Sequence, residues 1–230
     1  LGCEMNQIDW LLDAYGLEQG PLFQTMNIQN VTGLGKTIEI GIRKVKEMLP
    51  IANLAYREEC PVSELKIALQ CGGSDAWSGI TANPALGKAC DILISHGGTG
   101  LLAETPEIYG AEHLLTKRSV NQETGEKLVN LIKWWEDYTL RNKGTMDNNP
   151  SPGNKKGGLT TILEKSLGAS VKGGNTPLMG VYKYAEIVKE KGFTFMDSPG
   201  YDPASVTGQI AGGCNIVCFT TGRGSAFGSK

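Results

Sequence analysis

The fold class is decided by the stretch LKIALQ at residues 65–70 and by the segment CGGSD at residues 71–75, which follows it directly. A short apolar run bounded by a polar, glycine-rich segment is typical of a strand buried inside a sheet. A helix is expected soon afterwards, over residues 84–95. Strand, loop and helix in this order form the building block of proteins with parallel sheets.

The same alternation continues to the end of the chain. Short apolar runs predict further strands at residues 100–104, 193–196 and 215–220. Helical spacing of apolar residues predicts helices near 107–117 and over 121–142, 159–167 and 203–212, with a polar loop at 145–158. The pattern predicts an α/β fold, with a mostly parallel sheet flanked by helices in a Rossmann-like layered architecture.

The first 60 residues are expected to form a separate region. They predict helices over 5–15 and 34–49 and a short strand at 22–28. The polar, proline-broken stretch at 57–61 then marks a boundary. We therefore expect residues 1–60 to be the end of a preceding small α/β domain and residues 61–230 to be a C-terminal catalytic α/β domain. Because the chain starts without Met, we expect a fragment of a longer protein that lacks its N-terminal domain here.

Composition excludes several classes of function. The formal net charge is −2 and no dense Lys/Arg stripe occurs, which argues against a nucleic-acid partner. No apolar stretch approaches the roughly 20 residues that span a bilayer, and no signal-peptide pattern is present, so no membrane partner is expected. Six scattered cysteines without a zinc-type spacing fit a reducing, cytoplasmic location. A homodimer is expected because most oligomeric proteins are symmetric and dimers are the commonest among them.

Four polar segments follow predicted strands or lie beside their ends. In parallel sheets, ligands bind beyond the carboxyl ends of the strands, so these segments are candidates for one common site. They are Cys71–Asp75, Glu104–Glu107, Asp197–Tyr201 and Thr220–Ser225.

The first segment can bind an anionic, hydroxylated ligand. Two glycines allow the backbone to approach a ligand, and Ser74 and Asp75 can hold hydroxyl groups. A tight turn in which Asp75 caps the next helix is an equally acceptable interpretation.

The second segment places Glu104 and Glu107 at the junction between a strand and a helix. Such a carboxylate pair can bind a divalent cation or act as base and acid. Alternatively, Glu107 only stabilises the first helical turn.

Two further loops carry cations. Arg223, between glycines and close to Thr221, can bind a carboxylate bidentately, although a surface arginine on a turn would have the same sequence. Asn154 and Lys155 lie in the polar loop, where lysine can pair with a substrate carboxylate or act as a base. For the loop that carries Asn154 and Lys155, composition alone favours a solvated surface loop.

Several long blocks resemble the galactarate dehydratase/altronate dehydratase family, and in particular its C-terminal catalytic part. They are LGCEMNQ (1–7), LQCGGSDAWSGITANPALG (69–87), ETPEIYGAEHLL (104–115), NPSPGNKKGGLTTILEKSLG (149–168) and FTTGRGSAFG (219–228). The residues matched include Cys3, Glu4, Cys71, Ser74, Asp75, Glu104, Glu107, Asn154, Lys155 and Arg223.

The resemblance implies a lyase that dehydrates a sugar acid, such as galactarate or altronate, to a 2-keto-3-deoxy acid. It also implies a divalent metal, Fe2+. On this basis Glu104 and Glu107 are expected to act as acid, base or metal ligands, and Lys155 as base or enolate stabiliser. Arg223, Thr221 and Asn154 are expected on the substrate, together with Ser74 and Asp75, and Cys71 is a candidate metal ligand beside Glu104.

Two other functions remain open at this stage. The same family resemblance admits a sulfolactate sulfo-lyase, which would eliminate sulfite instead of water. A sugar-acid binding module without catalysis would keep the loops of Ser74 and Arg223 but would need no metal.

Overall fold

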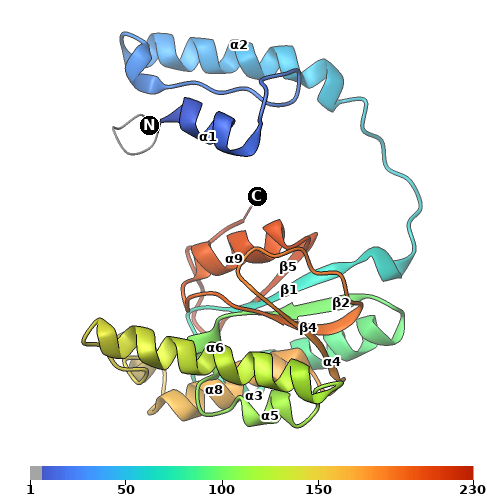
Figure 1. The fold of residues 1–230 in the computed structure, drawn as a ribbon, viewed down its shortest axis with the longest axis vertical. Coiled ribbons are helices and arrows are strands. Elements are labelled where there is room, and N and C mark those ends of the chain that lie inside the picture. The colour runs from blue at the N-terminus through green and yellow to red at the C-terminus, as the bar shows by residue number, and fades with distance from the viewer. Residues whose placement is uncertain (1–6, 230) are drawn as a thin grey trace. The chain divides into compact units, whose positions relative to one another are not determined.

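A computed structural model describes residues 7–229 of the chain, so Cys3 and Glu4 lie outside the described residues. The chain divides into two compact units, Leu1–Glu59 and Cys60–Lys230 (Figure 1). None of the helices within residues 7–229 is long and apolar enough to cross a membrane.

The N-terminal unit is helical in its described part. It contains α1 (Ile8–Tyr15), which ends at a left-handed Gly16, the 3-10 helix η1 (Ile28–Asn30) and α2 (Leu34–Ala52). The strand predicted at residues 22–28 is wrong. The chain there forms only an isolated antiparallel bridge between Gly20 and Phe23 before it enters η1, and a lone bridge is too short to be a strand.

The second unit is built on one sheet, which confirms the predicted α/β fold. Its strands in the described chain are β1 (Lys66–Cys71), β2 (Thr99–Leu102), β3 (Leu178–Tyr182), β4 (Gly192–Met196) and β5 (Ile216–Thr220). They lie in the order β3-β4-β2-β1-β5, and each pairing between neighbours is parallel. The central strands β2 and β4 are buried along their whole length, as expected for strands covered on both faces.

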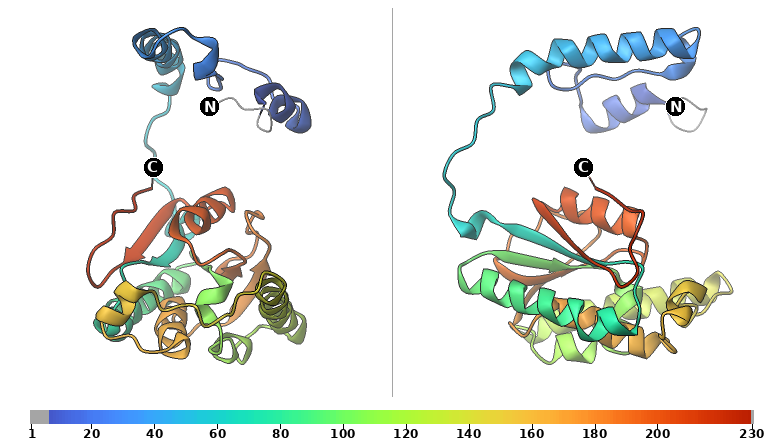
Figure 2. Two further views of the ribbon diagram at one scale, coloured as in Figure 1. Left: turned by 90° about the vertical axis from the view of Figure 1, so that its left-hand side faces the viewer. Right: turned by 180° about the vertical axis from the view of Figure 1, so that it is seen from behind.

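Helices cover the two faces of the sheet. In Figure 1, α4 (Ala82–Ser95), α6 (Gln122–Arg141) and α8 (Ile162–Ser170) lie on one side, and α9 (Asp202–Ala211) lies on the other. The view from behind in Figure 2 shows the same division. The connections after the neighbouring strands β2 and β4 therefore leave the sheet toward opposite faces, which opens a crevice at its carboxyl edge.

The two faces differ in chemistry because side chains alternate along a strand. Ile67 and Leu69 of β1 join the larger apolar cluster, whereas Ala68 belongs to a smaller one. The buried amide of Gln70 donates from Nε2 to Gln209 Oε1 of α9 at 2.8 Å. Polar contacts of this kind hold α9 in a fixed position against β1.

Several elements differ from the sequence prediction. The helix expected near 107–117 is interrupted by Gly110, whose φ of 84° turns the chain out of a helix. It forms the 3-10 helix η3 (Thr105–Ile108) and the one-turn helix α5 (His113–Thr116). Strand β3 and the short helices α3 (Ala76–Ile80) and α7 (Pro152–Lys156) were not predicted.

Candidate active site

A cavity of about 570 Å3 opens at the carboxyl edge of the sheet. The parallel pairing of the strands brings the loops after β1, β2, β4 and β5 to this edge, so all four predicted segments contribute residues to the cavity or its rim. Its wall consists of Cys71, Gly72, Gly73, Ser74, Pro106, Glu107, Trp135, Thr139, Thr145, Met146, Asn148, Asn149, Ser151, Asn154, Lys165, Gly200, Tyr201, Asp202 and Arg223. The volume lies within the range of small-molecule sites.

The loop after β1 approaches its neighbours more closely than a side chain would allow. A Cβ atom on Gly73, whose φ is +57°, would lie 2.2 Å from the carbonyl oxygen of Gly224. A Cβ atom on Gly72 would lie 2.5 Å from the ring of Phe219 and 2.6 Å from Oδ2 of Asp202. The two glycines therefore let the β1 loop fit between the β5 loop and the start of α9.

Replacing Gly72 by alanine is expected to lower the melting temperature of the protein. The added methyl group must displace Phe219 or Asp202, and over-packing of this kind costs about 1–3 kcal/mol. Thermal unfolding followed by circular dichroism measures the loss. Gly125→Ala is the matched control, because its added Cβ would meet only ordinary contacts, at 3.4 Å and beyond, inside helix α6. Equal melting temperatures of the two variants would contradict the close approach at Gly72.

An ion pair lies in the wall of the cavity. Nζ of Lys165 is 3.0 Å from each carboxylate oxygen of Glu107, and their side chains are only 12% and 8% exposed. Asn149 connects the two groups, since its Nδ2 donates to Glu107 at 2.6 Å and its Oδ1 accepts from Lys165 at 3.0 Å. The pair is thus held rigidly, with one edge open to the cavity.

The predicted residues Ser74 and Asn154 meet at this wall. The buried Asn154 donates from Nδ2 to the carbonyl oxygen of Ser74 at 2.9 Å. Its Oδ1 accepts from Ser151 Oγ at 2.9 Å and lies 3.4 Å from Lys165 Nζ. Asn154 therefore joins the β1 loop, α7 and the Lys165 ammonium.

The predicted Arg223 also lines the cavity. Its backbone N–H donates to the carbonyl oxygen of Gly73 at 3.2 Å, which fixes the turn after β5. The guanidinium lies against Gly153, where an added Cβ would be 3.1 Å from a terminal nitrogen. The side chain is exposed, so its donors are available to a ligand that enters from solvent.

Two further carboxyl groups lie close to these cations. Burial and the charge of Glu107 raise the pKa of Asp202, which lines the cavity. Burial and Glu107 also raise the pKa of Glu104 well above its ordinary value. Glu104 is 2% exposed and adopts a left-handed backbone with φ 73°, and its carbonyl oxygen accepts from the N–H of Glu107 at 2.8 Å. Glu104 lies behind the cavity wall and positions Glu107 through the backbone.

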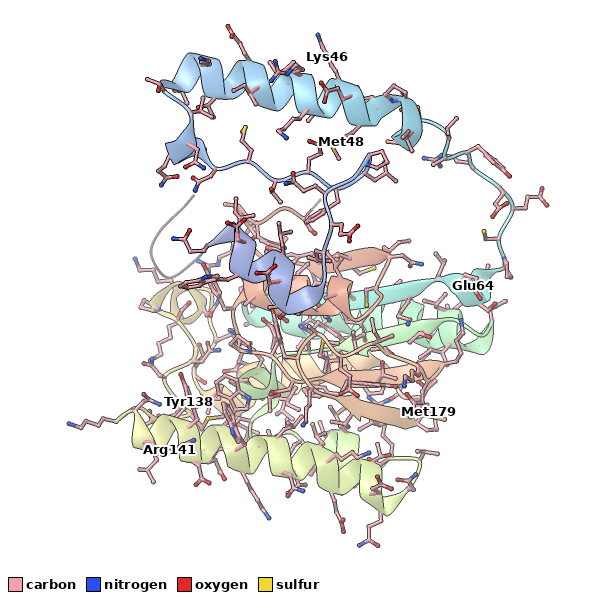
Figure 3. All side chains as sticks on the ribbon, turned by 45° about the horizontal axis from the view of Figure 1, so that its top comes forward. Lys46, Met48, Glu64, Tyr138, Arg141 and Met179 are labelled. Atoms are coloured by element: carbon pink, nitrogen blue, oxygen red, sulfur yellow. The ribbon has the colours of Figure 1, made fainter. Side chains whose placement is uncertain are left out.

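One aromatic side chain of α6 forms another part of the wall, and two more lie beside it on the helix. Trp135 lines the cavity, and its indole N–H donates to Oδ1 of Asp197 at 2.8 Å. Trp134 stacks on Tyr138 with ring centroids 5.1 Å apart. Figure 3 shows Tyr138 and Arg141 near the C-terminal end of this helix. Asp197 therefore fixes an aromatic wall and is not itself part of the cavity lining.

Besides Glu104, three predicted residues lie outside the cavity lining. Asp75 caps α3 by accepting from Ser78 N at 2.7 Å, which is the structural alternative noted for it above. Thr221 accepts from Gly224 N at 2.8 Å and stabilises the turn that carries Arg223. Lys155 lies on an exposed position of α7.

Sequence reasoning missed three charged groups near the site, namely Lys165, Lys172 and Asp202. Lys165 and Asp202 lie near the starts of helices and read there as ordinary polar positions. Lys172, in the 3-10 helix η4 (Val171–Gly173), is buried and donates from Nζ to Sγ of Cys71 at 3.1 Å. Of these three residues, the sequence could have suggested only Lys165, because it falls inside the block at 149–168 that resembles the family.

The described residues do not by themselves make a metal centre. Within residues 7–229, no three His, Cys, Asp or Glu side chains come together as a metal site. Of the two predicted ligands, Cys71 accepts a hydrogen bond from an ammonium group, and Glu104 has the same ammonium as an electrostatic neighbour. The donor set therefore does not fit the expected metal without ligands from elsewhere.

Comparison with known sequences agrees with the resemblance. The profile described as "D-galactarate/Altronate dehydratase, C-terminal" matches residues 62–230, and that described as "D-galactarate dehydratase/Altronate hydrolase, second domain" matches residues 1–53. The altronate dehydratase of Bacillus subtilis (strain 168) is 43% identical over 229 residues, which cover 100% of this chain and 46% of that protein.

Two other relatives are similar over most of the chain. The galactarate dehydratase (L-threo-forming) of Escherichia coli (strain K12) is 38% identical, over 99% of this chain and 45% of the relative. The (2R)-sulfolactate sulfo-lyase subunit beta of Chromohalobacter salexigens is 37% identical, over 84% of this chain and 50% of the relative. The chain thus spans about half the length of the curated relatives it matches. With a family profile covering residues 62–230, the chain belongs to the D-galactarate/altronate dehydratase family.

Proposed function

We propose that the parent protein dehydrates a hydroxylated sugar acid of the altronate or galactarate type to a 2-keto-3-deoxy acid at this cavity. The observation that supports this most directly is the set of charged groups in its wall. The cations Lys165 and Arg223 line the same cavity as the carboxyl groups of Glu107 and Asp202. Amide and hydroxyl groups between them suit a ligand with many hydroxyls.

The chemistry requires each of these residue types. Arg223 binds the substrate carboxylate, for which its planar fork of donors is well matched. Glu107 takes the proton from the carbon next to that carboxylate, and the electron pair of the C–H bond moves into the forming enolate. The ammonium of Lys165 stabilises the negative charge as it develops, because it is already held in place by Glu107 and Asn149.

Departure of the hydroxyl on the next carbon completes the reaction. Asp202 donates a proton to this hydroxyl, which leaves as water while the carbon–carbon double bond forms. A carboxyl group whose pKa is raised by burial keeps its proton to higher pH and is therefore suited to act as an acid. The resulting enol then converts to the 2-keto acid.

Dependence on Fe2+ remains a prediction from the family resemblance. The residues described here do not complete a ligand set, so no step above is assigned to a metal. When bound, a divalent metal would supply Lewis-acid stabilisation of the enolate. Its ligands would have to include groups beyond Cys71 and Glu104.

A sulfo-lyase acting on sulfolactate is the second candidate. The observation that favours it is the 37% identity to a sulfo-lyase subunit over 84% of this chain. The elimination would use the same base and the same carboxylate clamp, with sulfite as the leaving group in place of water.

An anaerobic assay of the full-length parent with Fe2+ separates these functions. Altronate, galactarate, glucarate and sulfolactate are supplied in turn, and 2-keto acid and sulfite are measured, each with and without a chelator. We expect keto acid from altronate or galactarate and loss of that product with the chelator. Sulfite from sulfolactate alone would favour the sulfo-lyase. Binding of a sugar acid without turnover of any substrate would favour a binding module.

A further inference from the structure

A lysine is buried at the floor of the cavity. Lys172 is 1% exposed, and its Nζ donates to Sγ of Cys71, which lines the cavity, at 3.1 Å. Lysine is almost never fully buried unless it is paired, and an apolar side chain of similar size would avoid the cost of desolvating the charge. Packing therefore does not explain why a lysine lies at this buried position.

The backbone that carries Lys172 is tightly fixed. A Cβ atom on Gly87 of α4 would lie 2.1 Å from the carbonyl oxygen of Val171, so α4 lies flush against η4. Gly174, with φ +60°, leaves no room for a side chain either, since its Cβ would lie 2.1 Å from Asp91 Oδ1. The fold thus holds this lysine at one position behind the end of β1.

Two neighbouring groups, Cys71 and Glu104, interact electrostatically with Lys172. Burial lowers the pKa of Lys172, but the Coulombic effects of Cys71 and Glu104 outweigh burial, and its pKa is raised. Glu104 in turn is 2% exposed, and Lys172 partly offsets the effect of burial on its carboxyl group. The ammonium of Lys172 thus has Cys71 as its hydrogen-bond partner, and the buried Glu104 is an electrostatic neighbour.

We propose that the ammonium of Lys172, and not a divalent metal, is the cation bound to Cys71 at the floor of the cavity, with the buried Glu104 as an electrostatic neighbour. Lys172 is then a positioning residue for the elimination described above, on which this inference rests. It fixes Cys71 in the cavity floor, and it adds a positive charge beneath the bound substrate. Any metal that the parent protein requires is bound by other groups.

A double-mutant cycle in the full-length parent tests this electrostatic interaction without any assay of turnover. Lys172→Met and Glu104→Gln are each expected to lower the melting temperature, by on the order of 5 °C, because each removes one of two buried groups that interact electrostatically. The double variant is expected to recover at least half of the summed loss, because neither group is then left buried without the other. Losses that simply add would overturn the pairing.

Metal content tests the rest of the proposal and uses variants that retain Lys172. Cys71→Ser and Glu104→Gln proteins, loaded anaerobically with Fe2+ and desalted, are expected to contain the same iron per chain as wild type. A loss of iron in both variants would show that they are metal ligands and would overturn the proposal. This readout does not depend on the substrate, so it stays informative even if the parent dehydrates no sugar acid.

Kinetics separate a positioning role from a purely structural one. Lys172→Met is expected to lower kcat about 100-fold with a KM within a few-fold of wild type, and Lys172→Arg is expected to restore part of kcat. An unchanged kcat in Lys172→Met, with the protein folded, would leave Lys172 only a structural role and would contradict this part of the inference.

Discussion

Replacing Lys165 by methionine in the full-length parent is expected to lower kcat/KM for its sugar acid on the order of 1000-fold. Methionine has a similar length but carries no charge, so the variant removes the ammonium that lies 3.0 Å from Glu107 without opening a cavity. The enolate then loses its preorganised cation, and the base Glu107 loses its orienting partner. Steady-state kinetics with keto acid as the product measure this effect.

The stability of the Lys165 variant needs its own control. Removing one member of a buried ion pair leaves the other without a partner and costs about 3–5 kcal/mol. Adding Glu107→Gln to Lys165→Met is expected to restore much of the melting temperature while activity stays low. Recovery of activity together with stability would show that the pair is structural and not catalytic.

Lys155 provides the direct comparison, because it was the lysine expected to act as base or enolate stabiliser. It lies on an exposed position of α7 and does not line the cavity, whereas Lys165 does. We expect Lys155→Met to retain activity within a few-fold of wild type, with the equally exposed neighbour Lys156→Met as a background control. A large loss in Lys155→Met with normal activity in Lys165→Met would return the assignment to Lys155.

Replacing Arg223 by alanine is expected to raise KM about 100-fold or more. The guanidinium lines the cavity, is open to solvent and is the donor best shaped for a substrate carboxylate. Loss of a bidentate, charge-assisted contact removes about 1.5–3 kcal/mol of binding for each hydrogen bond. Arg223→Lys keeps the charge but not the fork, so it is expected to fall between wild type and alanine.

The Arg223 prediction also has a built-in structural check. Because Arg223 is exposed, its removal should leave the melting temperature unchanged, and an unchanged KM in a folded Arg223→Ala protein would remove this residue from the site. Thr221 stabilises the same turn by accepting from Gly224 N, and Thr221→Val is expected to raise KM less than Arg223→Ala does.

The sequence was sufficient for those parts of the fold that local patterns determine. LKIALQ is a mostly apolar run because β1 is buried along most of its length, and such runs are recognisable. Strand β3 was missed because it is a half-buried edge strand, and its register with β4 shifts between Leu178 and Gly180. The prediction of one helix near 107–117 failed at Gly110, because the positive φ of this glycine depends on the tertiary path of the chain.

Local patterns predicted site residues where a loop directly follows a strand, whereas Asn154 was predicted from the polar loop and from the block at 149–168 that resembles the family. Ser74 and Arg223 belong to loops at strand ends, and the parallel topology brings such loops together. Lys165 meets Glu107 across 58 residues of sequence, and Lys172 meets Cys71 across 101. No local pattern marks either lysine, because each is brought to the site by helix packing against the sheet.

The central claim is that the cavity at the carboxyl edge of the sheet binds the sugar acid between Arg223 and the pair of Lys165 and Glu107. It is tested most directly by a crystal structure of the full-length parent with an aldarate analogue that lacks the departing hydroxyl. We predict one carboxylate of the analogue within hydrogen-bonding distance of the Arg223 guanidinium, with its adjacent carbon facing Glu107 and Lys165. A fully occupied analogue bound elsewhere, with this cavity holding only solvent, would contradict the account.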